Sequence, residues 1–568
     1  MAYRILEKRL STLMTLATVL GIILLPGLGH AASGVTAYKV AQIAVPGAAF
    51  TYPTAVNKGL AVVGHFGTSS GATEGFLLRG GKYTTLVFPG SNNLTEAGGI
   101  NDSGFIVGTF YGSDDIYHGF TYSKGSYTQY DLVGSANTSL LAVNNAGNLA
   151  GSAAPSPGID NQGFVVIGGT ATKFYASGSY ATFVSAINNL NQSAGTYYDF
   201  TGAAHGFYRD ASGNITLITF PGAQMTACQG ITDSGVIAGA YFDATNEWHG
   251  FTYSGGTYTS QAFYADEGIN NAGAVIGLYL GPGAPKGIQY GFLATPAKFQ
   301  SYSTVKLPKA TGAILYGTND SNAMVGLYSD SAGTTHGLLY ESGKVTNIDV
   351  PSGLPGSTTA YAINTSGTIV GSYRDQKTGD YLGFSYTGGT YAGVVIPGSQ
   401  STQIFGVNDS GAVAGGYFSQ AGAQLGFSFG KGVYFNLDIS APNSLSTSCW
   451  GLNDSVQITC QWEDENGFFQ SSLHDQSTST FTSINVPCAW NTFAGSINTN
   501  GDIAFRWIDT YGNSHGAILS AGSYYIFDVP SAVGASTEAY GINDSGDIVG
   551  SFVPAGNPTA LEGFVAKF

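Results

Sequence analysis

Short apolar stretches alternate with clusters of turn residues along this chain, and one version of the pattern recurs. Residues 541–550 read G-I-N-D-S-G-D-I-V-G, and residues 99–108 read G-I-N-D-S-G-F-I-V-G. The apolar residues on either side favour strands. The Asn-Asp-Ser-Gly between them is typical of a tight turn, because Asn and Asp side chains bond the local backbone and Gly adopts a positive φ. These ten residues therefore predict a β-hairpin.

The hairpin pattern occurs twelve times. Aligned on the Asn of the turn, neighbouring copies are mostly 43 to 45 residues apart, with one spacing of 38 and one of 49. The residue two before this position is Gly, Ala or Ser in every copy, which indicates a strand with one crowded face. A period of about 40–45 residues is typical of propeller blades. The turn positions are Asn57, Asn101, Asn144, Asn188, Thr232, Asn270, Asn319, Asn364, Asn408, Asn453, Asn498 and Asn543.

Each copy continues with two further strand signals. The first contains His-Gly-Phe or a related triplet, as at residues 118–120, 205–207 and 249–251, and a Gly-rich turn follows it. The last strand often ends in Pro-Gly or Val-Pro. Four strands in about 44 residues predict one antiparallel blade. We therefore expect an all-β, repeat-built β-propeller with twelve four-stranded blades.

The two ends of the repeat region favour ring closure. Residues 38–47 have the pattern of a fourth strand with no blade before it, and residues 563–568 that of a third strand with no fourth after it. The N-terminal strand can complete an unfinished blade and remove its open edge. Twelve blades exceed the usual four to eight, and the repeat is interrupted near residue 297. We expect two six-bladed propellers, at 35–297 and 298–568; one large ring and a seven-plus-five division are the alternatives.

The first residues have the pattern of a secretory signal. A basic stretch with Arg4, Lys8 and Arg9 precedes the apolar segment 13–25, and residues 29–31 (Gly-His-Ala) form a small-residue cleavage site. We expect a signal peptide at 1–31, with an uncleaved anchor as the alternative. No later segment is apolar for long enough to span a bilayer. The sequence thus predicts a secreted or extracytoplasmic protein, in the periplasm or at the cell surface.

The net charge narrows the range of partners. Residues 1–31 contain three basic residues and one acidic residue, which leaves 17 basic and 34 acidic residues and a net charge of −17. Such a surface repels nucleic acid and anionic membranes. We expect the partner to be a glycan or an extracellular protein and not a nucleic acid.

The doublet of motifs resembles a known family. G-I-N-D-S-G-D-I-V-G followed by His-Gly-Phe at this period is similar to the HAF-type extracellular repeats of secreted bacterial proteins, in which His-Ala-Phe stands in the place of His-Gly-Phe. The resemblance covers nearly the whole chain after residue 31. It implies a repeat-built extracytoplasmic protein, and it assigns no catalytic residue, because the family has no settled activity.

Two repeated features could be mistaken for metal sites. The Asn-Asp-Ser-Gly turns lack the run of oxygen ligands that Ca²⁺ needs. The His of His-Gly-Phe lies on the third strand, where equivalent residues of different blades are far apart, whereas zinc ligands converge within about 2 Å of one ion. We expect structural turns and hydrogen bonds in both cases, and neither a metal nor a cofactor. The histidines are His118, His205, His249, His336 and His515.

Copies ten and eleven depart most from the pattern. The strand Gly after the turn becomes Cys460 and Phe505, and the turn Gly becomes Val456. A local break in a repeat is a place to expect specialised function, with drift and compensating packing as the alternative. Four of the five Trp lie in these two copies, several beside loop carboxylates. The predicted ligand-binding residues are Trp450, Trp462, Glu463, Asp464, Trp490, Trp507 and Asp509.

Three of the four cysteines also lie in copies ten and eleven. Cys449 and Cys460 are nearly opposite each other across the predicted hairpin, so we expect a disulfide between them in an oxidising compartment. A bridge from Cys460 to Cys488 is the alternative. Cys228 has no partner nearby in the sequence and is expected to be free and buried.

These features support three hypotheses about function. The first is a secreted, non-catalytic binding or interaction protein that presents one propeller loop face to a glycan or a protein. The second is a carbohydrate-active hydrolase or lyase that uses the loop carboxylates Asp375, Asp464 or Asp509. The third is a structural surface or adhesion spacer. The chain has no phosphate-binding Gly loop, no Cys/His metal pattern and no Ser nucleophile elbow, so we prefer the first and assign no catalytic residue.

Overall fold

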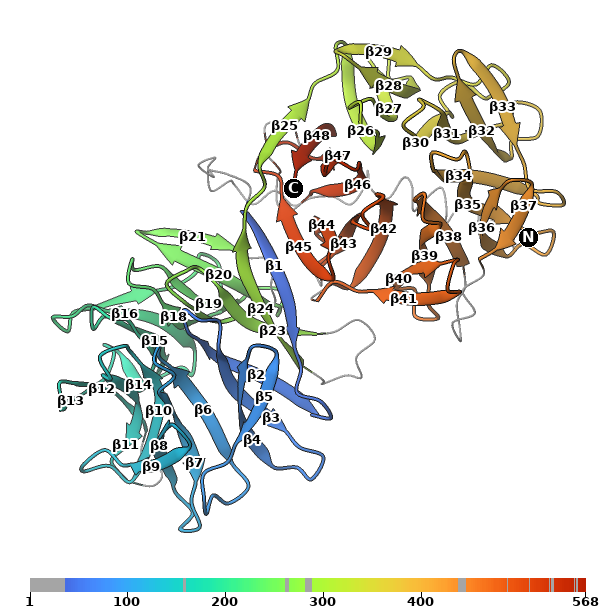
Figure 1. Ribbon diagram of the computed structural model, residues 1–568. Helices are drawn as coiled ribbons and strands as arrows, with labels where there is room; N and C mark the ends of the chain where they lie inside the picture. The colour runs from blue at the N-terminus through green and yellow to red at the C-terminus, as the bar shows by residue number, and fades with distance from the viewer. Residues whose placement is uncertain are drawn as a thin grey trace. The chain divides into compact units, whose positions relative to one another are not determined.

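The computed structural model describes residues 36–568 apart from 157–159, 261–264, 281–288, 438–445, 488, 510, 531, 533–535, 556 and 558–559. The predicted signal peptide, 1–31, lies outside the described residues. The residues that are described belong to one compact unit, Val35–Phe568. All of the elements in it are β-strands (Figure 1).

The strands follow one another at short intervals. As far as residue 297 they are β1 (Thr36–Ile43), β2 (Phe50–Val56), β3 (Val62–Gly67), β4 (Thr73–Arg79), β5 (Lys82–Leu86), β6 (Thr95–Ile100), β7 (Ile106–Tyr111), β8 (Tyr117–Ser123), β9 (Ser126–Tyr130), β10 (Asn137–Val143), β11 (Leu149–Ala154), β12 (Gln162–Ile167), β13 (Thr170–Phe174), β14 (Ser179–Ile187), β15 (Ser193–Asp199), β16 (Ala204–Arg209), β17 (Ile215–Ile218), β18 (Met225–Ile231), β19 (Ile237–Phe242), β20 (Trp248–Ser254), β21 (Thr257–Ser260), β22 (Ala265–Ile269), β23 (Val275–Leu280) and β24 (Gln289–Ala297).

The remaining strands repeat this arrangement. They are β25 (Ser301–Val305), β26 (Ala310–Thr318), β27 (Met324–Asp330), β28 (Thr335–Glu341), β29 (Lys344–Asn347), β30 (Thr359–Ile363), β31 (Ile369–Arg374), β32 (Tyr381–Thr387), β33 (Thr390–Val394), β34 (Ser401–Val407), β35 (Val413–Phe418), β36 (Gln424–Gly430), β37 (Val433–Asn436), β38 (Ser446–Leu452), β39 (Gln457–Glu463), β40 (Phe469–Asp475), β41 (Thr480–Ile484), β42 (Asn491–Ile497), β43 (Ile503–Ile508), β44 (Ser514–Ser520), β45 (Ser523–Asp528), β46 (Glu538–Ile542), β47 (Asp547–Phe552) and β48 (Glu562–Lys567).

These strands form four-stranded antiparallel sheets whose members are mostly consecutive, such as β2-β3-β4-β5 and β26-β27-β28-β29. Two sheets take their last strand from elsewhere in the chain. β1 pairs with β24, from Ala37↔Ala297 to Ile43↔Gly291, and β25 pairs with β48, from Ser301↔Lys567 to Val305↔Gly563. The expectation that the N-terminal strand completes an unfinished sheet is therefore confirmed. The sheets are those of a propeller fold.

Two pairings between sheets were not predicted from the sequence. The smaller is a parallel contact of β36 with β38 at Gln424↔Ser446, which joins two neighbouring sheets. In the larger, the other edge of β1 pairs antiparallel with β45, from Thr36↔Asp528 to Val40↔Tyr524. An eight-stranded sheet results, with the order β22-β23-β24-β1-β45-β44-β43-β42. The repeat pattern gives no sign of this contact, because it joins the outer edges of two sheets that are far apart in the sequence.

The Asn-Asp-Ser-Gly segments form the tight turns that the pattern predicts. In one of them Gly104 has a φ of 82°, and the Asn101 carboxamide accepts the N–H groups of Ser103 and Phe105. Asn191 and Asn322, which replace the Gly in two copies, also have positive φ values, of 60° and 58°. The prediction of structural turns is confirmed.

The turn Asn side chains also connect neighbouring sheets. We call the strand that leads into each turn Asn the inner strand of its sheet. The Asn side-chain Nδ2 donates to the backbone carbonyl of the equivalent residue in the next sheet, at 2.9 to 3.2 Å. In the first half these bonds run from Asn57 through Asn101, Asn144 and Asn188 to Thr232, and Asn270 bonds back to Asn57. In the second half they run from Asn319 through Asn364, Asn408, Asn453 and Asn498 to Asn543, which bonds back to Asn319.

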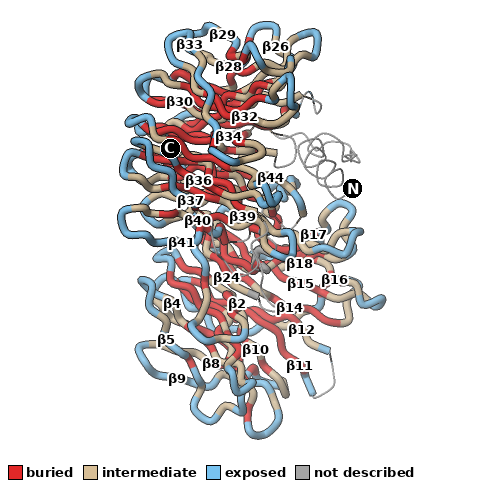
Figure 2. The backbone as a smooth tube through the Cα atoms, turned by 90° about the vertical axis from the view of Figure 1, so that its right-hand side faces the viewer, coloured by how far each residue is buried: buried red, intermediate tan, exposed pale blue. Residues whose placement is uncertain are grey.

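A Gly on the second strand and a Phe on the third strand form the core of most sheets. Gly108 pairs with Phe120, for example, and a Cβ at Gly108 would lie 2.2 Å from the Glu96 carbonyl oxygen and 2.6 Å from the Phe120 ring. The third-strand Phe is fully buried in most copies, and Figure 2 shows the buried runs along the strands and the exposed loops at their ends. In copy eleven the large residue lies on the second strand and the small one on the third, since Phe505 pairs with Ala517. Compensating packing thus explains this departure from the repeat.

Candidate functional site

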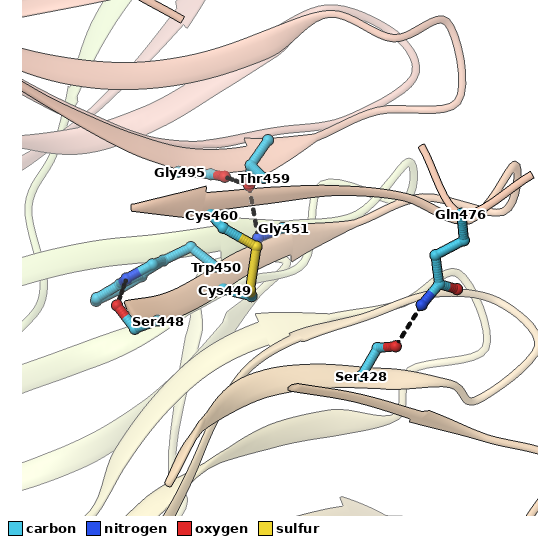
Figure 3. The surroundings of a disulfide bond; sticks show 9 residues. All are labelled: Ser428, Ser448, Cys449, Trp450, Gly451, Thr459, Cys460, Gln476 and Gly495. Carbon is cyan, nitrogen blue, oxygen red and sulfur yellow. Dashed lines mark hydrogen bonds between the residues drawn. A yellow bond between two sulfur atoms is a disulfide. The ribbon is translucent and has the colours of Figure 1, made fainter. Parts of the chain in front are cut away.

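The cysteines of copy ten form a bridge. Cys449 on β38 and Cys460 on β39 are direct partners in the strand register and are joined by a disulfide (Figure 3). Cys488, the partner in the alternative pairing, lies outside the described residues. Cys228 is buried and free, as expected. The disulfide stiffens the hairpin that carries Trp450.

Two of the predicted ligand-binding residues are inaccessible, so their assignment to a contact surface is wrong. Trp507 has no exposed surface, and its ring stacks on His515 at 4.4 Å between ring centroids. Asp509 is 2% exposed, and its carboxylate accepts the N–H groups of Tyr511 and Asn513. The physical reason lies in the repeat itself. Position 507 is nine residues after the turn Asn, where Tyr, Phe or Trp stands in eleven of the twelve copies and packs within the sheet.

Trp462 occupies the same repeat position in copy ten. Its ring is half-buried against the cluster that contains the disulfide and Ile458. Of the two acids beside it, Asp464 accepts the N–H groups of Asn466 and Phe468 and so holds a turn. The structure therefore places Trp462 and Asp464 in the framework near the loop face.

Trp450 lies on an inner strand rather than in a loop. Its ring stacks on Phe405 at 4.3 Å, and its Nε1 donates to the Ser448 hydroxyl at 3.2 Å (Figure 3). Tyr361 meets both rings edge to face. Trp450 thus belongs to a layer of aromatic side chains on the inner strands of the second half.

Trp490 keeps its predicted exposure, at 42%. It lies just before β42, and its ring contacts Phe468 at 5.6 Å. A second pair joins the same two segments, since Phe469 contacts Phe493 at 5.0 Å. The Arg506 guanidinium lies over the Phe493 ring, 4.2 Å from its centroid. We call these residues, together with Glu538, the aromatic patch: Phe468, Phe469, Trp490, Phe493, Arg506 and Glu538.

Charge in the aromatic patch is concentrated in one ion pair. The Arg506 Nη1 donates to the Glu538 Oε1 at 2.6 Å, and the Tyr540 hydroxyl donates to the other oxygen of the same carboxylate. Burial alone would lower the pKa of Arg506, but the Glu538 carboxylate outweighs it and raises that pKa above its ordinary value. The patch therefore presents a fixed cation and a fixed anion beside aromatic rings.

The three carboxylates considered for catalysis have another role. Asp375, Asp464 and Asp509 each accept backbone N–H groups within their own loop. These bonds hold the pKa of Asp375 below its ordinary value. Burial alone would raise the pKa of Asp509, but the bonds from His515 and Asn513 lower it. A general acid needs a raised pKa, so Asp375 and Asp509 are poorly suited to that role.

The third-strand histidines make the hydrogen bonds that the sequence predicts, and their partners follow a spacing that sequence analysis missed. In four of the five, an Asp six residues before the His accepts from its Nε2 or lies beside it, whereas His118 contacts Asp114 and Asp131. The pairs are Asp199–His205 (2.9 Å), Asp243–His249 (2.9 Å), Asp330–His336 (3.5 Å) and Asp509–His515 (3.4 Å). The D-x5-H spacing is visible in the sequence, but only the strand register shows that it joins a loop to a strand.

His515 is expected to make stability depend on pH. Burial alone would lower its pKa, but the carboxylates of Asp528 and Asp509 outweigh burial and raise the pKa to about 9. A raised folded-state pKa contributes stability that is complete below the unfolded value of about 6.5 and is lost as the pH rises through about 9. We expect wild-type stability to fall across this interval and the His515→Gln variant to fall less. NMR titration of His515 checks the cause, and a pKa at or below 6.5 would contradict it.

The inner strands of the first half carry a half-buried carboxyl that sequence analysis did not single out. The Tyr52 hydroxyl donates to the Glu267 Oε1 at 2.8 Å, and the Gln229 amide donates to the Oε2 at 3.3 Å. Burial raises the pKa of Glu267 to about 7. The two halves therefore differ in what their inner strands present: polar residues in the first, aromatic rings in the second.

Two general features of the described residues bear on function. Among the described residues between 36 and 568, no helix is long and apolar enough to cross a membrane. Within the same part of the chain, no group of three or more His, Cys, Asp or Glu side chains is placed to hold a metal ion.

Comparison with known proteins gives distant structural matches. No family model matches the chain, and no curated protein does. TolB from Acinetobacter baumannii is 12% identical with a TM-score of 0.29, and the match covers 46% of this chain and 65% of TolB, just under two thirds of its length. The extracellular domain of the putative one component system BT4673 from B. thetaiotaomicron is 10% identical with a TM-score of 0.28, over 86% of this chain and 82% of that one.

A lectin is among the matches. The BP39L lectin from Burkholderia pseudomallei is 12% identical with a TM-score of 0.24, and the match covers 59% of this chain and 94% of the lectin. Because these similarities are so distant, the fold assignment rests on the strand order and pairings given above. The chain is an all-β protein built of four-stranded antiparallel propeller sheets.

Proposed function

We propose that the chain forms two six-bladed propellers, at 35–297 and 298–568. The hydrogen bonds of the turn Asn side chains support this arrangement. In the second half they pass through six repeats and return to Asn319. In the first half they run from Asn270 through Asn57 to Thr232, whose side chain has no Nδ2 to continue the series. The pairings of β1 with β24 and of β25 with β48 support it as well, because each gives one half a fourth strand for its last sheet.

We further propose that the protein is extracytoplasmic and belongs with the HAF-type repeat proteins. The signal pattern at 1–31 and the disulfide between Cys449 and Cys460 support an oxidising compartment. The doublet of repeat motifs supports the family assignment.

The protein's function on this view is non-catalytic binding of a glycan through the aromatic patch. One observation carries the proposal: exposed Trp490 and half-buried Phe493 each pair with a ring from the β40 segment, next to the Arg506–Glu538 ion pair. Aromatic rings pack against the apolar faces of sugars, and fixed charged groups beside them bond sugar hydroxyls. A rigid platform of this kind suits binding, whereas the nearby carboxylates Asp464 and Asp509 are occupied by turn bonds.

A glycan array run with the intact secreted protein and with two variants tests the proposal. Trp490→Ala is expected to weaken binding of the selected glycan at least about tenfold, which corresponds to about 1.4 kcal/mol. Phe200→Ala removes a 79% exposed aromatic of the first half and is expected to leave binding unchanged. Melting temperatures of both variants control for folding. Equal binding by Trp490→Ala, or no glycan bound by the intact protein, would sink the proposal and favour a protein partner or a spacer.

A further inference from the structure

The inner strands of the second half carry a feature that the aromatic patch does not explain. Three residues before the turn Asn, five of the six copies have an aromatic residue and the sixth has Gly495; the five are Tyr316, Tyr361, Phe405, Trp450 and Tyr540. The corresponding residues of the first half include no aromatic; they are Thr54, Gly98, Leu141, Ser185, Gln229 and Glu267. A difference confined to one position of one half indicates a role specific to that half.

The five rings form a layer by contacting one another in chain order around the inner strands. Ring centroids are 4.9 Å apart for Tyr540 and Tyr316, 5.0 Å for Tyr316 and Tyr361, and 5.0 Å for Tyr361 and Phe405. The interplanar angles range from 10° for Phe405 and Trp450 to 87° for Tyr361 and Trp450. The rings are therefore inclined differently relative to one another.

A cavity of about 80 Å³ lies against this layer. The five rings line it together with aliphatic side chains that directly precede the turns, among them Ile363, Val407 and Leu452. The layer has a gap at Gly495, where a Cβ would lie 2.2 Å from the Tyr540 carbonyl oxygen, so no side chain can fill it. A water needs roughly 10–15 Å³ of such space, so the cavity has room for several heavy atoms. We call it the aromatic chamber.

The polar ends of the rings make bonds outside the chamber. The Trp450 Nε1 donates to Ser448 and the Tyr540 hydroxyl to Glu538, and neither acceptor lines the chamber. Burial raises the pKa of Tyr316, Tyr361 and Tyr540, so the phenols stay neutral. The chamber wall therefore has no charged side chain, and the polar residues Thr318 and Ser496 line it beside the rings.

Charged side chains lie next to the chamber, at its rim. A second cavity of about 80 Å³ adjoins the chamber through the residues that precede the turns, and it is lined by the turn carboxylates Asp320, Asp409, Asp454 and Asp544. Among the described ion pairs none involves these four residues. Each of the four carboxylates accepts one backbone N–H from the turn of a neighbouring copy; Asp454, for example, accepts the N–H of Asp409. The corresponding first-half positions are Lys58, Asp102, Asn145, Asn189, Asp233 and Asn271.

We propose that the aromatic chamber binds a small organic cation of the alkylammonium class. Aromatic rings attract such cations through their faces, and a low-dielectric passage lined by carboxylates raises the local concentration of cations at its entrance. The aromatic layer and a rim with four aspartates occur together in the second half, whereas the same positions of the first half hold no aromatic residue and, at the rim, two aspartates and a lysine. The proposal goes beyond glycan binding, since no residue of the aromatic patch lines the chamber.

Calorimetric titration with choline and with 3,3-dimethylbutan-1-ol tests the chamber. The alcohol has the same shape with carbon in place of the charged nitrogen. We expect one choline site per chain and binding of the neutral analogue weaker by about threefold to thirtyfold, the range that corresponds to cation–π interaction. Equal affinity for the two compounds, or no binding of choline, would overturn the proposal.

Rim variants locate the site without disturbing the core. Asp454→Asn combined with Asp544→Asn is expected to weaken choline binding severalfold. Asp102→Asn combined with Asp233→Asn changes matched positions in the first half and is expected to have no effect. Tyr316→Leu opens the aromatic layer, and its melting temperature shows whether a loss of binding reflects unfolding. Equal weakening by the two rim pairs would contradict the assignment to the second half. The glycan array is scored separately, so failure of one proposal does not imply failure of the other.

Discussion

Replacing Trp507 by alanine is expected to lower the free energy of unfolding by about 3–5 kcal/mol, as for other large buried side chains. The Trp507 ring is fully buried, it stacks on His515, and it packs in a cluster with Phe505 and Val40. Alanine leaves a cavity that the surrounding strands cannot close without breaking their register. Urea unfolding followed by circular dichroism measures the loss.

Trp490→Ala is the matched control for this variant. Trp490 lies in the same copy but is 42% exposed, and its substitution is expected to change stability by less than about 0.5 kcal/mol. If Trp507→Ala were as stable as Trp490→Ala, the burial of Trp507 would be contradicted and its place in a contact surface would be restored.

Introducing proline at Val40 is expected to destabilise the protein strongly, by roughly 3 kcal/mol or more. Val40 is buried in β1, where it pairs with Ala294 on one side and with Tyr524 on the other. Proline removes the backbone donor from the middle of an eight-stranded sheet and leaves a buried carbonyl without its partner. The expected result is a lower urea midpoint and faster proteolysis.

Val40→Ala separates the backbone effect from the loss of the side chain. Alanine keeps the N–H group and removes two methyl groups, at about 0.8 kcal/mol for each. We expect Val40→Pro to be clearly less stable than Val40→Ala. Equal stability of the two variants would mean that β1 is not held between β24 and β45.

Local features of the fold were predictable because each repeat specifies them by itself. The turn at Asn101–Gly104 follows from four residues, and the Gly at 108 opposite Phe120 follows from strand alternation within one copy. Repetition then fixes the strand order. The pairing of β1 with β45 could not be predicted in this way, since it depends on the outer edges of two distant sheets.

The candidate site was predicted less well, because composition was given more weight than repeat position. Trp462 and Trp507 stand where other copies have a core Tyr or Phe, so alignment of that position would have placed them within the sheets. At the repeat position of Trp490 the only other aromatic residue is Tyr180, which is half-buried, and Trp490 is exposed. Phe493 and the Arg506–Glu538 pair were missed, because their contact joins three strands and appears only when the register is known.

The most direct test of glycan binding at the aromatic patch is calorimetric titration of the best array glycan against two matched variants. Phe493 and Phe183 occupy the same repeat position, five residues before the turn Asn, in the second and first halves, and both are half-buried. We predict that Phe493→Ala weakens binding at least about tenfold and that Phe183→Ala leaves it unchanged, with similar melting temperatures. Unchanged binding by Phe493→Ala, or equal weakening by both variants, would contradict a glycan site at the patch.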